Sequence, residues 1–574
     1  MSYLKSIGTA VIYIGVFLAV ITFMPGLPPD TEFQEFSVTP PRKFDPKVGP
    51  KNRLNNAEKL FDGEINGPEG FDSYDGQLYT GVHGGYILRI EEDRLVSIVK
   101  FGKKCEGIWQ EHKCGRPLGM KFDKKGNLYV VDTYYGIFKV NVTTKNYENI
   151  VNISKPIDGK ISRIPNSIDI AKNGDLYWTV SSTDFALYDI VQSFLANPSG
   201  RLIRYNAVEK KNEVLMRNLA FANGIMLSDD ESFVIVAETQ ADRIMKYNLK
   251  GPKAGQQEIF IDGLPGLPDN IHSDGQGGFL VTLIITVDSE HPQLFQSLAP
   301  HPYIRKMLVR LLLTMELPFK LLHDIYPNIF TERLLHAIGS FHGLGSLIQA
   351  KDQSQLLRID ASGNIVEILS SEDDTISHMS AAHIHNGFLW FGSPWNKYLT
   401  RVPLKQAFPD LANSGKQFSH SKSEKLPNVD IKTEKGKRDT GSMTPKSTAA
   451  PTTPKLTAAP TTTPKPTAAP TTPKPTATPT TSKSTAAPKS SSKTDKPINN
   501  NAKPSETKSS AEVKKDNAKT ASNAKSKSPN VKSEEDIQSK KNVKVEQDAS
   551  KQKAQKSHSE KVNRVETSRP KSDL

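Results

Sequence analysis

The C-terminal part of this chain of 574 residues contains no aromatic side chain. Residues 419–574 hold no Phe, Tyr or Trp and consist mainly of Lys, Ser, Thr, Pro and Ala. Such a segment cannot bury enough apolar surface to offset the entropy that a chain loses on folding. We therefore expect the folded part of the chain to lie within residues 33–408.

The folded part also lacks an excess of positive charge. The whole chain carries +13, but residues 411–574 hold 33 Lys and Arg against 16 Asp and Glu, whereas the remainder holds 42 against 46. A nucleic-acid-binding protein is expected to carry a folded basic face with aromatic side chains beside it. Composition therefore argues against nucleic acid as a partner, and the basic tail is interpreted as a solvated spacer.

A long uncharged run stands near the N-terminus. Residues 7–24 contain no charged side chain, a length that just suffices to cross a bilayer, and Lys5 precedes the run. The run ends without the small residues that signal peptidase prefers, although a cleaved signal peptide is the alternative. We expect an uncleaved signal anchor in a single-pass type II membrane protein, at the cell surface or in the endomembrane lumen.

Cysteine is scarce: only Cys105 and Cys114 are present. In an oxidising compartment two cysteines this close together are expected to form a local disulfide, and they lack the spacing partners of a zinc site. The sequence also contains the N-glycosylation sequons that begin at Asn141 and Asn152. These features predict an exported glycoprotein.

A repeated strand–turn–strand pattern organises the folded part. An apolar residue, an Asp/Asn–Gly turn and a β-rich segment recur six times, and the first five copies lie about 50 residues apart, which is typical of propeller blades. The turns lie at Asp75, Gly126, Asn173, Asp229, Asp274 and Asn386. The sequence therefore predicts an all-β, six-bladed β-propeller.

The fifth unit is interrupted by an insertion between Leu280 and Gln355. Apolar residues recur there at helical spacing, namely Ile304, Met307, Leu308, Leu311, Leu312 and Met315. The insertion is predicted to form an amphipathic helix and a second helix near residues 332–338. Either it is a lid packed over one propeller face, or it contacts a membrane surface or gates a substrate.

The tail begins with Thr–Ala–Ala–Pro repeats at Thr448, Thr457 and Thr467. Proline keeps such a backbone extended and threonine offers hydroxyls for O-glycans, so we expect a mucin-like segment that glycan-binding proteins recognise; a plain Pro-rich linker is the alternative. The expected domains are a cytosolic stub and anchor (1–28), the propeller (29–410), a linker (411–440), the mucin-like repeats (441–492) and a disordered Lys/Ser-rich tail (493–574).

Four motifs together resemble a known family. They are residues 114–120 (CGRPLGM), 132–136 (DTYYG), 222–224 (ANG) and 267–271 (LPDNI). In this order they are similar to strictosidine-synthase-like proteins, a group that includes the adipocyte plasma membrane-associated proteins, and the mucin-like tail resembles that of the insect hemomucins. The resemblance implies a six-bladed propeller, type II topology and kinship with paraoxonases and gluconolactonases.

The resemblance also implies a Ca²⁺ site in the central channel. The matching positions are Glu69, Asn166, Asn223 and Asp269, one in each of four units. Carboxylate and amide oxygens are the ligands that Ca²⁺ prefers, although each residue alone would equally suit a turn.

The catalytic positions of the family are not preserved. Ser377 stands where strictosidine synthase has a catalytic Glu, and Leu118 stands where paraoxonases have a His. Strictosidine synthase activity is therefore not expected. Asp269, His83 and His378 are the remaining catalytic candidates.

Two functions remain open. The chain is interpreted as a membrane-anchored surface mucin whose propeller acts in recognition or adhesion, in immunity or development. The alternative is a Ca²⁺-dependent arylesterase or lactonase that acts on a small ester or lactone. A fold shared with enzymes does not establish catalysis.

Overall fold

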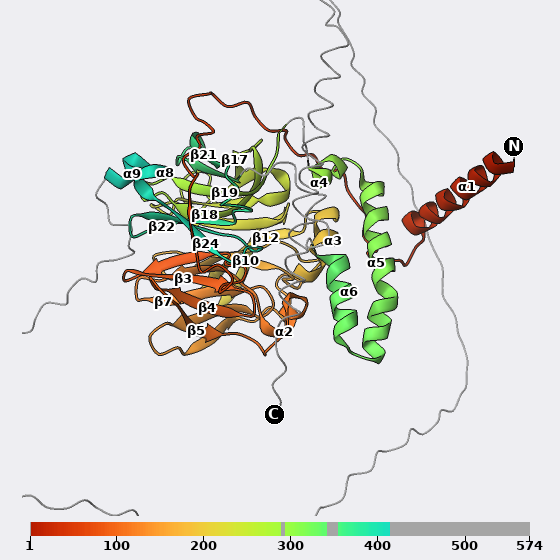
Figure 1. Ribbon diagram of the computed structural model, residues 1–574, viewed down its shortest axis with the longest axis horizontal. Helices are drawn as coiled ribbons and strands as arrows, with labels where there is room; N and C mark the ends of the chain where they lie inside the picture. The colour runs from red at the N-terminus through yellow and green to blue at the C-terminus, as the bar shows by residue number, and fades with distance from the viewer. Residues whose placement is uncertain (1, 289–292, 341–353, 414–574) are drawn as a thin grey trace, which may run out of the picture. The chain divides into compact units, whose positions relative to one another are not determined.

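The computed structural model describes residues 2–288, 293–340 and 354–413 (Figure 1). The mucin-like repeats and the Lys/Ser-rich tail predicted for residues 441–574 lie outside the described residues.

Most of the described chain forms six four-stranded antiparallel sheets. In five of them four consecutive strands are paired in chain order. Their bounds are β2 (Phe71–Tyr74), β3 (Gln77–Val82), β4 (Tyr86–Ile90) and β5 (Leu95–Lys100); β6 (Pro117–Phe122), β7 (Asn127–Asp132), β8 (Gly136–Asn141) and β9 (Tyr147–Val151); β10 (Pro165–Ile170), β11 (Leu176–Val180), β12 (Gly200–Asn206) and β13 (Lys211–Leu219); β14 (Ala222–Leu227), β15 (Phe233–Glu238), β16 (Arg243–Asn248) and β17 (Gln257–Ile261); β18 (Gly266–Ser273), β19 (Phe279–Thr286), β20 (Ser354–Ile359) and β21 (Ile365–Ser371).

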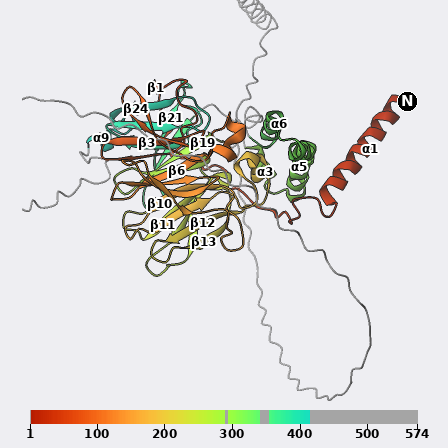
Figure 2. The ribbon, with the colours of Figure 1, turned by 90° about the horizontal axis from the view of Figure 1, so that it is seen from below.

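The sixth sheet combines the first strand of the chain with its last three strands. It contains β22 (Ala381–His385), β23 (Phe388–Gly392), β24 (Leu399–Pro403) and, as its outer strand, β1 (Glu58–Leu60). The first strands β2, β6, β10, β14, β18 and β22 contact one another in that order, and β22 contacts β2. This propeller-like arrangement, seen from a second side in Figure 2, leaves each sheet neighboured on both sides.

The predicted turns are observed where left-handed backbone is required. Asn386 and Gly387 join β22 to β23 with φ of 48° and 78°, and Asp75 and Gly76 join β2 to β3 with φ of 49° and 73°. Two successive positive φ values suit a tight hairpin, which is why Asx–Gly pairs recur at these points.

Polar side chains connect several neighbouring sheets. Asp72 accepts the backbone N–H of Phe122 at 2.6 Å, and Asp169 accepts that of Leu227 at 2.8 Å. The Thr239 hydroxyl donates to the carbonyl of Pro268 at 2.7 Å. These buried bonds fix the register between neighbouring first strands, where no sheet ladder runs.

The insertion forms α4 (Leu294–Leu298), α5 (Pro302–Ile325) and α6 (Ile329–Gly339), so both predicted helices are confirmed. β19 and β20 pair across it, as the interrupted fifth unit requires. Figures 1 and 2 show α5 and α6 side by side along the β-structure, next to α3 (Ile190–Leu195). Not all of the predicted apolar stripe faces inward, because Ile304 and Met315 are exposed whereas Arg305 and Arg310 are buried.

The N-terminal run forms α1 (Ser2–Phe23), which by length and composition alone can cross a membrane. It contacts α5. The other helices of the described residues are short: α2 (Glu111–Cys114), α8 (Leu404–Ala407), α9 (Pro409–Asn413) and three single-turn 3₁₀ helices, Ile108–Gln110, Leu187–Asp189 and Thr239–Ala241.

Candidate cation and ligand site

Bulges in the first strands aim side chains at the centre of the ring. The pairing register shifts between Pro165 and Ile168 in β10, between Ala222 and Ile225 in β14, and between Pro268 and Ile271 in β18. A bulge re-aims the side chain that it contains. Each of these three bulges contains one predicted ligand, namely Asn166, Asn223 or Asp269.

Small residues beside them allow the first strands to approach closely. A Cβ on Gly224 would overlap the carbonyl oxygen of Asp269 and lie 2.8 Å from the carbonyl carbon of Asn270. A Cβ on Gly119 would lie 2.6 Å from the Cα of Ser167. The absence of a side chain at these positions therefore brings neighbouring bulges together.

One cavity of about 410 Å³ is lined by all four predicted ligands, Glu69, Asn166, Asn223 and Asp269, and by His83 and His378. Its other walls are mostly apolar, with Leu118, Phe194, Phe221, Leu267, Ile284 and Trp395 among them. A pocket of this size, apolar apart from a few convergent polar groups, is typical of small-molecule sites.

Three buried oxygens in this cavity have no hydrogen-bond partner: Oδ1 of Asn166, Asn223 and Asp269. The orientation of Asn166 is set, because its Nδ2 donates to Ser181 Oγ at 3.0 Å and Ser181 Oγ donates to the carbonyl of Ala222 at 2.8 Å. A buried polar atom without a partner costs about 1–3 kcal/mol, so three together require an explanation.

Burial disfavours the ionised forms of two carboxyl groups in the cavity, those of Asp269 and Glu69. Burial raises the pKa of Asp269 well above its usual value, and the nearby Glu69 carboxylate raises it further, against a hydrogen bond from Asn223. Burial also raises the pKa of Glu69, although Arg116 and His83 oppose the rise. Arg116 Nη2 donates to Glu69 Oε2 at 2.8 Å, and Arg116 Nη1 donates to the carbonyl of Gly67 at 2.7 Å.

These residues fit a divalent cation. Three carboxyl groups line the cavity (Glu69, Glu111 and Asp269) against one guanidinium, that of Arg116. When all three are ionised the formal charge is therefore −2, histidines apart, which one Ca²⁺ would neutralise. The described residues contain no metal-binding cluster of three or more His, Cys, Asp and Glu; the set proposed here mixes two carboxylates with two amides, which Ca²⁺ accepts.

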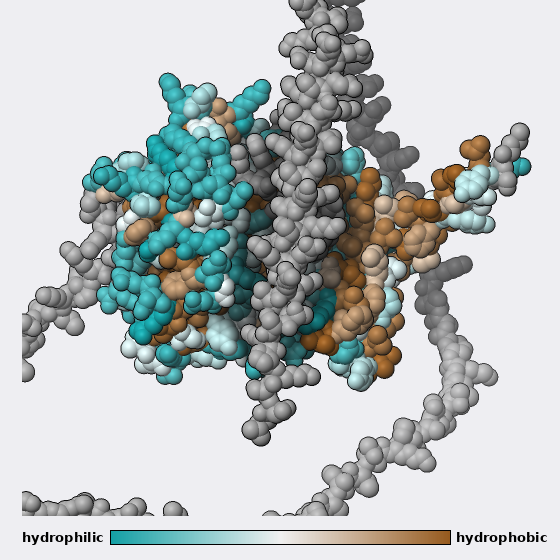
Figure 3. Space-filling view, in the orientation of Figure 1, coloured by the Kyte–Doolittle hydropathy of each residue, from teal (hydrophilic) through white to brown (hydrophobic). Residues whose placement is uncertain are grey.

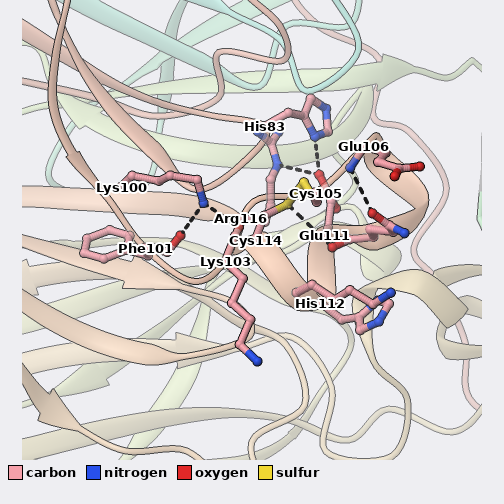
Figure 4. Close-up of a disulfide and its surroundings, with 12 residues drawn as sticks. His83, Lys100, Phe101, Lys103, Cys105, Glu106, Glu111, His112, Cys114 and Arg116 are labelled. Atoms are coloured by element: carbon pink, nitrogen blue, oxygen red, sulfur yellow. Dashed lines mark hydrogen bonds and ion pairs between the residues drawn. A yellow bond between two sulfur atoms is a disulfide. The ribbon is translucent and has the colours of Figure 1, made fainter.

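The predicted disulfide between Cys105 and Cys114 is confirmed, with Cα atoms 5.6 Å apart (Figure 4). It closes the loop that contains α2, and Glu111 at the start of α2 is bonded to His83 Nδ1. Burial acts to raise the pKa of Glu111, but His83 and Arg116 hold it below its usual value. The disulfide thus supports one wall of the cavity.

The two candidate histidines are engaged in contacts with the cavity wall. His83 Nε2 lies 3.0 Å from the carbonyl oxygen of Pro394, so both its ring nitrogens already face acceptors. His378 has a φ of 51° and its ring packs edge-on against Trp395 at 4.8 Å.

Sequence reasoning missed several polar residues of the cavity, among them Glu111, Arg116 and His336. Arg116 stands inside the CGRPLGM motif, immediately before β6, and a cation within that motif was the available signal. His336 comes from α6, and burial lowers its pKa against the pull of Glu111. Nothing in the sequence connects that helix with the cavity.

Comparisons with known proteins agree with the motifs. A family model described as strictosidine synthase matches residues 166–252, and one described as strictosidine synthase-like, N-terminal, matches residues 50–90. The chain is 40% identical over 414 residues to the adipocyte plasma membrane-associated protein Hemomucin of Drosophila melanogaster, covering 71% of each chain. It is 30% identical over 376 residues to the adipocyte plasma membrane-associated protein of Rattus norvegicus, covering 65% of this chain and 92% of the relative.

Solved structures resemble the fold only distantly. A gluconolactonase from Xanthomonas campestris is 13% identical, covers 65% of this chain and 98% of its own, and has a TM-score of 0.39. The calcium-binding protein regucalcin from Agrobacterium tumefaciens is 11% identical, covers 60% of this chain and 92% of its own, and has a TM-score of 0.36. Likeness at this level carries no argument about function.

Proposed function

Because this chain belongs to the strictosidine-synthase-like family of adipocyte plasma membrane-associated proteins, we propose that it is a membrane-anchored surface protein whose six-bladed propeller binds Ca²⁺ and a small apolar ligand, in the service of recognition or adhesion. The three partnerless oxygens of Asn166, Asn223 and Asp269 in one largely apolar cavity carry the proposal. The six sheets around the cavity are interpreted as the six blades.

The proposed topology is type II, with Lys5 on the cytosolic side and the propeller in the lumen or outside the cell. The exposure of both sequon asparagines supports it. Asn141 Oδ1 accepts the backbone N–H of Thr143 at 3.1 Å, and Asn152 Oδ1 accepts that of Ser154 at 2.9 Å. Both side chains therefore lie in surface turns that an N-glycan can occupy.

Glu69, Asn166, Asn223 and Asp269 would hold the ion. Bound there, Ca²⁺ would supply a positive charge that polarises a ligand carbonyl or carboxylate. The chain's own residues set the rest of the site: Arg116 orients Glu69, the bulges orient the two amides, and the apolar walls exclude water from the ligand.

Equilibrium binding of radioactive Ca²⁺ to the full-length protein in lipid nanodiscs tests this site. Asn223→Leu keeps the side-chain volume and removes the amide oxygen, so we expect at least a tenfold loss of affinity. Asn146→Ala, at an exposed asparagine of the β8–β9 turn, is the matched control and should bind as the parent does. Equal affinity in Asn223→Leu and the parent would refute the site.

A Ca²⁺-dependent arylesterase or lactonase is the second candidate, because the same cavity places the proposed cation residues beside apolar walls. Hydrolysis of phenyl acetate and of a γ-lactone should then require Ca²⁺ and fall sharply in Asp269→Asn. If the parent binds Ca²⁺ but hydrolyses neither compound, the recognition function stands alone.

The recognition function includes the predicted mucin-like repeats, which lie outside the described residues. We expect the full-length protein from animal cells to bind a lectin specific for O-glycans, and a chain without residues 441–492 to lose that binding. Retained binding would place the glycans elsewhere.

A further inference from the structure

Apolar side chains cover the outer side of α5 and the start of α6. This α5–α6 apolar face consists of Leu317, Leu321, Leu322, Ile325, Ile329 and Phe330, with exposed fractions that reach 84% at Ile325 and 65% at Phe330. Figure 3 shows the hydrophobic colour gathered over these helices, in contrast to the largely hydrophilic sheets. Soluble proteins rarely expose so continuous an apolar surface without a partner.

The side of α5 that faces the sheets is apolar too, since Val309 is fully buried there and Leu308 and Leu312 pack in the same cluster; it also carries buried polar side chains. Arg305 is buried and donates to the carbonyls of Leu195 at 3.1 Å and Ala196 at 3.0 Å. Glu316 is also buried and bonds to Gln192 and, at 2.6 Å, to Lys320. A helix on a water-exposed surface carries apolar residues on its inward side only, whereas a helix that is apolar on both sides is covered on both. The second apolar side of α5 therefore indicates that water is not what surrounds its outer side.

α5 is fixed to the end of the anchor helix. Arg310, of which 2% is exposed, donates to the carbonyls of Ile21 at 3.1 Å, Thr22 at 3.0 Å and Met24 at 2.9 Å. The last carbonyls of a helix have no partner within it, so Arg310 satisfies groups that α1 leaves open. The rings of Phe23 and Tyr303 also pack at 5.6 Å. The end of a spanning helix lies at the membrane surface, and α5 therefore begins there.

We propose that the α5–α6 apolar face lies in the interfacial layer of the bilayer that α1 crosses, as a second and peripheral membrane contact. Tyr303 in the first turn of α5 and Tyr326 directly after its end are both exposed, and tyrosine is enriched at the level of the lipid headgroups. His336 of α6 lines the cavity and Phe330 of α6 belongs to the apolar face. They are six positions apart along the helix, about 9 Å of helix axis, so the contact holds the cavity close to the lipid.

Single cysteines can report the surroundings of this face, because Cys105 and Cys114 are paired and every introduced thiol is the only free one. The full-length chain, one copy per phosphatidylcholine nanodisc, is labelled with an environment-sensitive fluorophore at Leu321→Cys, Ile325→Cys or Phe330→Cys. Val208→Cys, in the β12–β13 turn and 88% exposed in the parent, is the matched control.

We expect doxyl-labelled phosphatidylcholine to quench the three test positions at least threefold more than Val208→Cys, and aqueous iodide to show the reverse order. Iodide quenching of the test positions equal to that of the control would mean that water covers the face and would overturn the proposal. Protection of the test positions from both quenchers would mean that protein covers the face, and would overturn it equally.

Discussion

At the residue scale, the site depends on pairs of adjacent residues. One residue supplies a ligand oxygen, and the next has no side chain and so lets a neighbouring strand approach closely. Asn223 aims its side chain at the cavity, while Gly224 lets the neighbouring bulge pass at backbone distance. The ligand position and the close approach are therefore inseparable, and a change in either is expected to affect binding.

Gly224→Ala tests this coupling. The added Cβ would meet backbone atoms of Asp269 and Asn270, which cannot rotate away, so we expect a loss of about 1–3 kcal/mol in the free energy of unfolding and weaker Ca²⁺ binding. Thermal unfolding and Ca²⁺ titration measure both. Gly159→Ala is the control, because that glycine has a φ of 73° and open space around it, so only backbone strain is added. Unfolding of Gly224→Ala at the parent's temperature would contradict the argument.

Arg116→Met tests the charge balance of the cavity. Arg116 is 1% exposed and pairs with Glu69 at 2.8 Å, so its removal leaves a buried carboxylate unpaired, at a cost of about 3–5 kcal/mol. Saturating Ca²⁺ should restore part of this loss, because the ion supplies positive charge at the same place. Melting temperatures of variant and parent, with Ca²⁺ and with chelator, check the prediction. An equal loss under both conditions would argue against a cation at Glu69.

At the scale of elements, the insertion is joined to the sheets by an ionisable cluster. Burial raises the pKa of Asp189 to about 7, and Glu316 adds to the rise, against Lys320 and Arg163. Asp189 lies in the 3₁₀ turn before α3, and Glu316 and Lys320 lie on α5. The attachment of α5 is therefore expected to depend on pH.

The direction in which stability changes with pH follows from the number of protons that the folded and unfolded states bind. Because the pKa of Asp189 is higher in the folded state than its usual value near 3.8, the folded state holds a proton that the unfolded state has released, so stability falls as pH rises from about 4 to about 7. We expect α5 amides to exchange faster at pH 8 than at pH 6, after correction for intrinsic rates. Asp189→Asn should flatten this dependence, whereas Asp184→Asn, beside Lys160 at the surface, should keep it. The same slope in Asp189→Asn would exclude Asp189 as its origin.

At the scale of the whole molecule, ring closure combines one β-pair with apolar packing between the first and last sheets, which includes Phe71 and Trp390. β1 pairs with β24 through only three residue pairs, from Glu58 with Arg401 to Leu60 with Leu399. An ion shared by residues from four sheets would cross-link the ring at its axis, where the sheets share no backbone ladder.

Removal of Ca²⁺ should therefore lower the melting temperature of the full-length protein by several degrees. A ligand that binds only the folded state adds about 2.7 kcal/mol at a hundredfold excess over its Kd. Asp269→Ala should lower the melting temperature even with Ca²⁺ present, because it removes one of two carboxylate ligands. If neither chelation nor Asp269→Ala changes the melting temperature, the four residues are ordinary turn formers and the hydrolase candidate falls with them.

The features that the sequence predicted by itself are local ones. Asx–Gly turns, alternating strands, the uncharged run of α1, the Cys105–Cys114 disulfide and the helices of the insertion each depend on residues close together in the chain, whose conformational preferences act before any tertiary contact forms. The four proposed ligands came from motif resemblance. They line one cavity because each occupies a corresponding position, near the start of the first strand of its unit.

Only the tertiary structure decided which distant residues meet. It brought Glu111, Arg116 and His336 to the same cavity, and it paired β1 with β24 across more than three hundred residues, where no local pattern specifies a partner. It also turned Arg305 and Arg310 inward and left Leu321 and Ile325 exposed. Helical spacing marks an apolar side of a helix, but it does not say what covers that side. An arginine turns inward only where the folded chain leaves carbonyl groups for it to satisfy, and these groups come from distant parts of the sequence.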